Sequence, residues 1–103
     1  MQERIAKALL ECVFYRVSAI VSVGENGQIL GVQLFSTDWP DRHMHFTEEA
    51  KEVWLISNHP DGEMHPDEQD VRNYRSLVSR MPGVQVRLYL SSEYFSCFET
   101  TIL

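Results

Sequence analysis

Apolar residues recur at helical spacing in two stretches of the chain. In residues 2–14 they follow the i, i+3, i+4, i+7, i+8 pattern of one helix face, and they are Ile5, Ala8, Leu9, Cys12 and Val13. This spacing predicts an amphipathic helix with one buried stripe. A similar stripe in residues 66–80 predicts a second long helix, and its members are Val71, Tyr74, Leu77, Val78 and Met81.

The second helix also carries signals for its two ends. Asp67 can cap its N-terminus, and Asp70 stands three residues further on, which is a variant of the capping box. Pro82 and Gly83 are typical of the residues that follow a helix. We therefore expect the helix to begin near Pro66 and to end at Arg80.

Five stretches predict strands because they are rich in β-branched residues or alternate between apolar and polar positions: residues 16–23, 28–36, 53–56, 84–90 and 94–101. Between the first two, Asn26 and Gly27 predict a tight hairpin turn, since both residue types tolerate positive φ. The polar residues 91–93 predict a turn before the last strand.

The stretch between the second and third predicted strands divides into a loop and a short helix. Pro40 and the neighbouring aspartates predict a loop over residues 37–46. Thr47 can cap a helix and the acids after it suit a first turn, which predicts one or two helical turns over residues 47–52. The whole order predicts an α/β (α+β) fold, with a mixed sheet of about five strands, two main helices and one short helix. We expect residues 1–103 to form a single domain.

Composition and charge narrow the functional classes. The chain has 103 residues, 15 acidic against 9 basic, and a net charge of -6. This excess of acidic residues disfavours binding to a phosphate backbone, so we expect no direct nucleic-acid partner. It favours a protein partner with a basic surface. No apolar run reaches membrane-spanning length and no secretory apolar segment is present, so we expect no membrane association and a cytoplasmic location. Cys12 and Cys97 lack metal-motif spacing and are expected in the core.

The richest chemistry lies in residues 57–70. Two of the four histidines, two of the four prolines and five carboxylates fall within these fourteen residues. A predicted strand precedes the segment and the second predicted helix follows it. A polar loop between a strand and a capped helix is a common place for a functional site.

This segment resembles the metal-site motif of the RadC-like branch of the JAB/MPN superfamily. There, His-x-His-Pro-x-Gly is followed by Pro-Ser-x-x-Asp and a helix. Here the corresponding runs are Ser57-Asn58-His59-Pro60-Asp61-Gly62 and Pro66-Asp67-Glu68-Gln69-Asp70. Residues 20–36, 44–49 and 93–99 resemble the family's opening hairpin, helix start and closing strand. The likeness therefore extends from about residue 17 to the end, and it implies a JAB/MPN-like, cytidine-deaminase-like architecture.

In that family two histidines and an aspartate hold zinc, and a glutamate on the hairpin is the general base for hydrolysis of peptide or isopeptide bonds. The resemblance implies that His59 and Asp70 are metal ligands. Three family positions are altered: Ser57 replaces the first histidine, Gln33 stands where the base is expected, and Asp67 replaces the serine. With two of three ligands and no base, we expect a metalloprotease-like pseudoenzyme that has no resident cofactor.

His59 and Asp70 also have a purely structural interpretation. His59 would satisfy a buried hydrogen bond of the loop, and Asp70 would stabilise the helix N-terminus. His65 and Glu63 can supply a replacement metal ligand, although both suit a solvated loop surface.

Two further candidates lie in the loop of residues 37–46. His43 and His45 alternate on an extended segment, so both imidazoles can reach one ion. Trp39, beside Pro40, is a candidate for binding a protein, whereas Trp54 lies in an apolar run and is expected in the core.

Three hypotheses about function follow. The first is a non-catalytic RadC-like domain that acts as a protein-binding or regulatory module, with a homodimer through an exposed strand edge as a further possibility. The second is a zinc hydrolase whose ligands are His59, Asp70 and one of His43, His45 or His65. The third is a small acidic inhibitor, phage- or plasmid-borne, that blocks a basic surface by charge.

Overall fold

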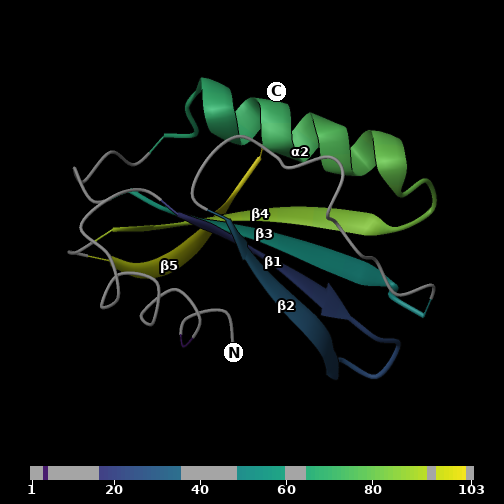
Figure 1. The fold of residues 1–103 in the computed structure, drawn as a ribbon. Coiled ribbons are helices and arrows are strands. Elements are labelled where there is room, and N and C mark those ends of the chain that lie inside the picture. The colour runs from purple at the N-terminus through teal and green to yellow at the C-terminus, as the bar shows by residue number, and fades with distance from the viewer. Residues whose placement is uncertain (1–3, 5–16, 36–48, 60–64, 93–94, 102–103) are drawn as a thin grey trace.

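The computed structural model describes residue 4 and residues 17–35, 49–59, 65–92 and 95–101. The elements in chain order are β1 (Ser18–Val23), β2 (Ile29–Phe35), β3 (Glu52–Asn58), α2 (Glu68–Arg80), β4 (Gln85–Ser92) and β5 (Phe95–Thr100). The strands form one five-stranded sheet in the order β2-β1-β3-β4-β5, and α2 lies along one of its faces (Figure 1). The prediction of an α+β fold with a mixed sheet of about five strands is confirmed.

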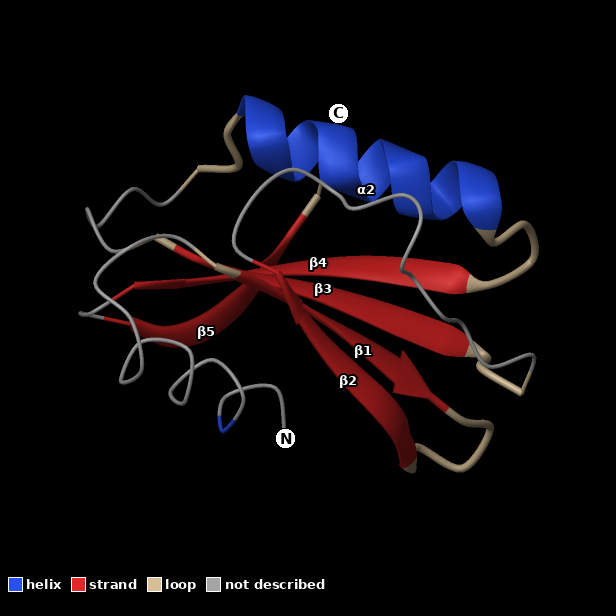
Figure 2. Ribbon diagram, in the orientation of Figure 1, coloured by secondary structure: helices blue, strands red, loops and turns tan. Residues whose placement is uncertain are grey.

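The sheet combines two antiparallel hairpins with one parallel contact. β1 pairs antiparallel with β2 and with β3, and β4 pairs antiparallel with β5. β3 and β4 are parallel, because the chain returns through α2 before it enters β4 (Figure 2). Parallel strands require such a crossover, and this one places the N-terminus of α2 at the edge of the sheet where β3 ends.

Apolar side chains fill both faces of the sheet. The face that α2 covers buries a cluster made up of Ile20, Ala50, Val53, Leu55, Leu77, Met81, Leu88 and Leu90. The opposite face buries a second cluster made up of Ala19, Val21, Val23, Trp54, Ile56 and Tyr89. β1 and β3 therefore carry buried apolar residues on both sides, which explains why their sequences show little strict alternation, whereas β4 alternates because Arg87 lies on the face opposite α2. The core position predicted for Trp54 is confirmed, with 7% of its surface exposed.

The hairpin between β1 and β2 is confirmed, and one of the two residues that were expected to tolerate a positive φ adopts it. Gly27 has a φ of 82°, and no other residue in the described part of this turn has a positive φ. The amide of Gly27 donates to the carbonyl of Gly24 (3.0 Å), and the amide of Gly24 donates to the carbonyl of Gln28 (2.8 Å). These contacts describe a three-residue loop in which a tight turn is followed by one left-handed residue. Asn26 therefore keeps an ordinary backbone conformation.

The short helix predicted over residues 47–52 is not seen in its described part. Residues 49–51 form a turn and a bend, and Glu52 is the first residue of β3. The amide of Lys51 donates to the carbonyl of Val23 (2.9 Å), and the carbonyl of Lys51 accepts from the amide of Gln85 (3.3 Å). These two contacts with distant strands hold this backbone extended, so they override the local helix signals. Residues 47 and 48 lie outside the described residues.

Two further predictions need correction. Val78 is 46% exposed rather than part of the buried stripe, because Asp70, Asn73 and Leu77 occupy the line of α2 that faces the sheet. Residues 91 and 92 belong to β4 and not to a turn, since Ser91 pairs with Asn58 of β3.

Several predictions are only partly covered by the described residues. The predicted helix over residues 2–14, which includes Cys12, is described only at Arg4, which is helical. Cys97 lies in β5, as predicted. No helix in the described ranges has both the length and the apolar character that a membrane crossing needs.

Candidate functional site

The candidate site lies where β3 ends and α2 begins. Ser57 and Asn58 are the last residues of β3, and His59 follows them directly. The amide of His59 donates to the carbonyl of Ser91 in β4 (2.7 Å), which fixes the backbone at the carboxyl ends of two parallel strands. Crevices outside the carboxyl ends of parallel strands are the usual ligand sites of open α/β sheets. The fold thus places residues 57–59 at a position suited to binding.

The start of α2 is stabilised by a capping box. Asp67 is the N-cap, and its Oδ1 accepts from the amide of Asp70 (3.0 Å). In return Oδ2 of Asp70 accepts from the amide of Asp67 (3.1 Å). Two amides that would otherwise lack a partner at the helix end are satisfied in this way. The predicted roles of Asp67 and Asp70 at the helix N-terminus are confirmed.

His59 and Asp70 form a buried pair. Their exposed fractions are 2% and 0%, and Nε2 of His59 lies 2.9 Å from Oδ2 of Asp70, at hydrogen-bond distance. The same Asp70 oxygen also takes part in the capping box, so it serves the helix end and the histidine together. These two residues, far apart in the sequence motif, are therefore in direct contact.

Three side chains are close enough to share a cation. One ligand atom each from His59, Asp67 and Asp70 can be chosen so that all three atoms lie within 4.8 Å of one another. One imidazole and two carboxylates form a donor set that suits a divalent transition metal. Asp67 is exposed and borders a surface depression that Pro66, Glu68, Val71 and Arg72 also line, whereas His59 and Asp70 are buried. The ligand that Asp67 offers was not among those predicted from the sequence.

A cation at this place would compete with existing hydrogen bonds. Oδ2 of Asp70 already has Nε2 of His59 and the amide of Asp67 as partners. A carboxylate oxygen has two main lone-pair directions, so a metal bond to this atom would displace one of them. The residues fit a metal in kind, but a metal bond to Oδ2 of Asp70 requires that the hydrogen bond from His59 or the one from Asp67 open.

The altered family positions have structural partners of their own. Ser57 is fully buried, and its Oγ lies 3.1 Å from Oγ of Ser18 on β1. Gln33 lies on β2 opposite Ile20, which in turn pairs with Leu55 of β3. Two strand spacings, about 10 Å, therefore separate the backbone of Gln33 from β3. Neither residue supplies a metal ligand or a base at His59.

Polar residues that the sequence did not single out surround this pair. Asn58 is fully buried, and its Oδ1 accepts from the amide of Val17 (2.6 Å). Asn73 and Ser91 are 1% exposed, and Nδ2 of Asn73 and Oγ of Ser91 have no hydrogen-bond partner among the described residues. Asn73 stands three residues after Asp70, so its place on the same helix face was open to prediction from helical periodicity.

The remaining candidates do not join the site within the described residues. His65 is exposed and does not belong to the group formed by His59, Asp67 and Asp70. The other predicted positions lie outside the described residues, and they are Trp39, His43, His45 and Glu63.

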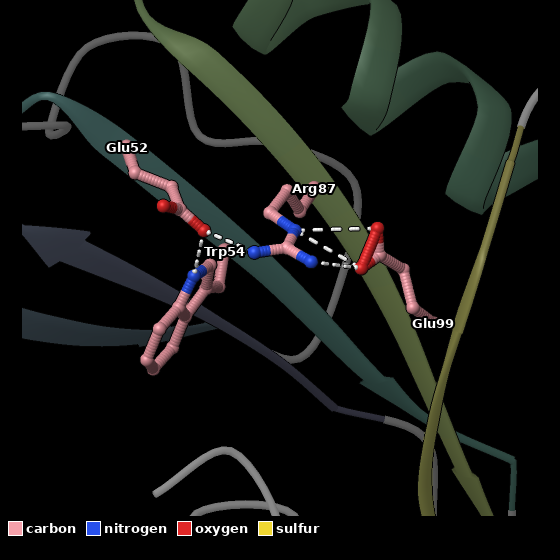
Figure 3. A network of polar contacts seen from close by, with 4 residues as sticks. All are labelled: Glu52, Trp54, Arg87 and Glu99. Atoms are coloured by element: carbon pink, nitrogen blue, oxygen red, sulfur yellow. Dashed lines mark hydrogen bonds and ion pairs between the residues drawn. The ribbon is translucent and has the colours of Figure 1, made fainter. Parts of the chain in front are cut away.

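A second polar network lies on the face of the sheet opposite α2 (Figure 3). Arg87 of β4 donates from Nη1 to Glu52 of β3 (2.9 Å) and from Nη2 to Glu99 of β5 (2.7 Å). The indole Nε1 of Trp54 donates to the same Glu52 oxygen (2.7 Å). The network joins three neighbouring strands and sits over the ring of Tyr89, which lies 5.8 Å from the guanidinium carbon.

The electrostatics of this network indicate a structural role. Burial raises the pKa of Glu52, but the hydrogen bonds from Trp54 and Arg87 outweigh burial, and the pKa is lowered overall. Hydrogen bonds to Glu99 and then to Glu52 raise the pKa of Arg87. The two carboxylates and the guanidinium are thus paired with one another inside the network, so the network does not strongly attract an ion from solution.

No protein-family model matches the chain, and no curated protein matches it at a significant level. The RadC-like interpretation therefore continues to rest on the motif in residues 57–70 and on the order of the flanking elements.

Proposed function

We propose that this chain is a non-catalytic JAB/MPN-type, RadC-like domain that acts as a protein-binding or regulatory module. The JAB/MPN architecture, with a second main helix over residues 2–14, is part of this proposal, as is a cytoplasmic location. Support comes from the order of the described elements: a hairpin, a strand that ends at the motif, and a capped helix that returns the chain to a parallel strand.

The observation that carries the proposal is the direct hydrogen bond between His59 and Asp70. The two retained ligand positions are buried and use their polar atoms on each other, at 2.9 Å. Ser57, at the position of the lost histidine, uses its hydroxyl on Ser18. Each of these contacts stabilises the fold without a metal, so the motif retains a structural use after the hydrolytic chemistry is lost.

A metal-dependent hydrolase is the second candidate, because Asp67 stands close enough to complete a three-ligand set with His59 and Asp70. These three residues would hold the ion, and a bound zinc would lower the pKa of a water molecule into the neutral range. Gln33 cannot accept that proton, since an amide is not a base at neutral pH. This candidate therefore needs a different general base from the family's glutamate.

Titration of zinc into chelator-stripped protein tests the proposal. We expect no binding heat in calorimetry and no rise in melting temperature, because His59 and Asp70 already use their polar atoms on each other and on the helix cap. The variants His59→Ala and His65→Ala form a matched pair, since the first removes a buried imidazole and the second an exposed one. A submicromolar site that His59→Ala abolishes and His65→Ala retains would overturn the proposal in favour of the hydrolase.

A further inference from the structure

The turn between β1 and β2 carries two neighbouring residues that can react with each other. Asn26 and Gly27 are both exposed, and they lie between the end of β1 at Val23 and the start of β2 at Ile29. A bond from the backbone nitrogen of Gly27 to the side-chain carbon Cγ of Asn26 closes a cyclic imide. Because both groups belong to adjacent residues, they are held together at a high effective concentration.

Gly27 leaves the approach to its nitrogen open. Glycine has no Cβ, so no side chain of its own shields the backbone amide. A Cβ added at Gly27 would meet no atom of the described chain within 4 Å. No neighbouring segment among the described residues therefore covers this side of the turn, and water has access to it.

Exposure distinguishes Asn26 from the other asparagines. The sequence has three asparagines, and the remaining two, Asn58 and Asn73, are 0% and 1% exposed. They are followed by His59 and Tyr74, which both carry a side chain next to the backbone nitrogen. Asn58 ends β3 and Asn73 lies within α2, so regular hydrogen bonding also fixes their backbones. A reaction that needs water and an adaptable backbone is therefore favoured at Asn26.

Two hydrogen bonds of the turn oppose the reaction. The amide of Gly27, which is the attacking group, donates to the carbonyl of Gly24 (3.0 Å). The amide of Asn26 donates to Oε1 of Gln28 (2.9 Å), which restrains the backbone just before the attacking nitrogen. Both contacts belong to a surface turn, and local opening of such turns requires little free energy. The reaction should therefore proceed from the opened turn and be slowed by the closed one.

We propose that Asn26 is a site of spontaneous deamidation whose rate is set by the opening of this turn. Hydroxide takes the proton of the Gly27 amide, and the nitrogen forms a bond to Cγ of Asn26. The side-chain nitrogen of Asn26 takes up a proton from water and leaves as ammonia. Water then opens the cyclic imide at either carbonyl carbon. One opening leaves aspartate at position 26, and the other leaves isoaspartate, in which the main chain runs through the side-chain carbon.

Both products change the hairpin. Each adds a negative charge beside a surface depression that Glu25, Glu49 and Lys51 line together with the turn. Isoaspartate also adds a carbon to the main chain of a tight loop, which the contact between Gly27 and Gly24 closes. Deamidation thus alters both the charge and the backbone at this end of β1 and β2.

Peptide mapping by mass spectrometry tests the site on the full chain after incubation in mildly alkaline buffer. We expect deamidation at Asn26 and none at Asn58 or Asn73 over the same period. The variant Asn26→Gln should stay unmodified at this position, because attack on the longer side chain must close a larger ring. Absence of deamidation at Asn26, or an equal rate at Asn58 or Asn73, would overturn the proposal.

Denaturant and a second variant test the control by the turn. Loss of one hydrogen bond of ordinary net strength changes a rate by roughly two- to tenfold, so Asn26 should react faster by about this factor in guanidinium chloride. Gln28→Ala should accelerate the reaction in the folded chain, because it removes the partner of the Asn26 amide. Gln85→Ala is the matched control, since Gln85 is an exposed glutamine outside the turn, and it should leave the rate unchanged. A Gln28→Ala variant that reacts like the wild type, or a rate that guanidinium chloride does not raise, would refute this control.

Discussion

Replacing Asp70 with alanine removes two contacts from the start of α2. Oδ2 of Asp70 accepts from the amide of Asp67 (3.1 Å) and pairs with Nε2 of His59 (2.9 Å). Loss of a capping contact costs about 0.5–2 kcal/mol. A buried polar atom left without a partner, here Nε2 of His59, costs about 1–3 kcal/mol. We therefore expect Asp70→Ala to lower the free energy of unfolding by about 2–4 kcal/mol, a large share of the stability of a small domain.

Urea denaturation followed by far-ultraviolet circular dichroism measures this loss. With the usual urea dependence for a chain of this size, the midpoint should fall by about 1–2 M. The control is Glu68→Ala, which removes an exposed acid from the same helical turn and should cost under about 0.5 kcal/mol.

A double-mutant cycle isolates the contribution of the pair. His59→Ala should cost about 1–2 kcal/mol less in the Asp70→Ala background than in the wild type, because the shared hydrogen bond is then already absent. Two outcomes would contradict the reasoning. In one, the two single losses simply add. In the other, Asp70→Ala is as mild as Glu68→Ala, and the pair would then contribute little to folding.

Three further predictions concern the core, a turn and the acid response. Leu77→Ala should lower the free energy of unfolding by about 2–5 kcal/mol, because Leu77 is fully buried between α2 and the sheet. Val78→Ala, on the exposed side of the helix, should lower it by under about 0.5 kcal/mol. Equal losses in urea denaturation would contradict the observed rotation of the helix. Gly27→Ala should cost about 1–2 kcal/mol because Gly27 has a φ of 82°, while Gly31→Ala, where a Cβ has open space and φ is not positive, should be neutral or stabilising in thermal melts. The pKa of Glu52 is lowered in the folded state, so its stabilisation is present above the ordinary value of 4.5 and is lost as the pH falls through the lowered folded value. Glu52→Gln should therefore be less stable than the wild type at neutral pH and should lose less stability on acidification; parallel pH profiles would rule out this origin.

Local sequence rules were sufficient for elements that are stabilised by local contacts. The hairpin of β1 and β2 follows from the glycine-containing turn between two β-branched runs. The start of α2 follows from Asp67 and Asp70, whose capping contacts span only three residues. The core position of Trp54 follows from the apolar run around it. In each case the residues that decide the structure lie close together in the chain.

The predictions failed where contacts between residues far apart in the sequence determine the structure. The backbone of Lys51 is held extended by Val23 and Gln85, and neither residue can be connected with Lys51 by a local pattern. In the observed rotation of α2, Asp70 contacts His59, and the polar residues Asp70 and Asn73 face the sheet together with Leu77. Helical periodicity alone favours the more hydrophobic side, and it therefore placed Val78 in the core. Tertiary packing overrode this preference.

The candidate site was predictable in its members but not in its geometry. The motif singled out Ser57, His59, Asp67 and Asp70 from residue type and order. That His59 and Asp70 satisfy each other, and that Asp67 rather than His65 stands beside them in the described part of the chain, depends on the path from β3 into α2. The sequence does not encode this path in any short pattern.

β3 should be among the last strands to pair during folding and the last to open, because it lies between the two hairpins. It pairs antiparallel with β1 and parallel with β4, so it joins two hairpins that are each closed by neighbouring strands. Its partners in β4 stand 33 positions away, as for Leu55 and Leu88, and its partners in β1 stand comparably far, as for Ile20 and Leu55. Both contacts of β3 therefore carry a larger loop-closure entropy than the two hairpins and should form late. The two hairpins should behave as separate units in hydrogen exchange, with β2 opening first and the amides of β3 exchanging only on global unfolding. Trp54, in the middle of β3, is then an intrinsic probe of whole-domain unfolding rather than of local fraying.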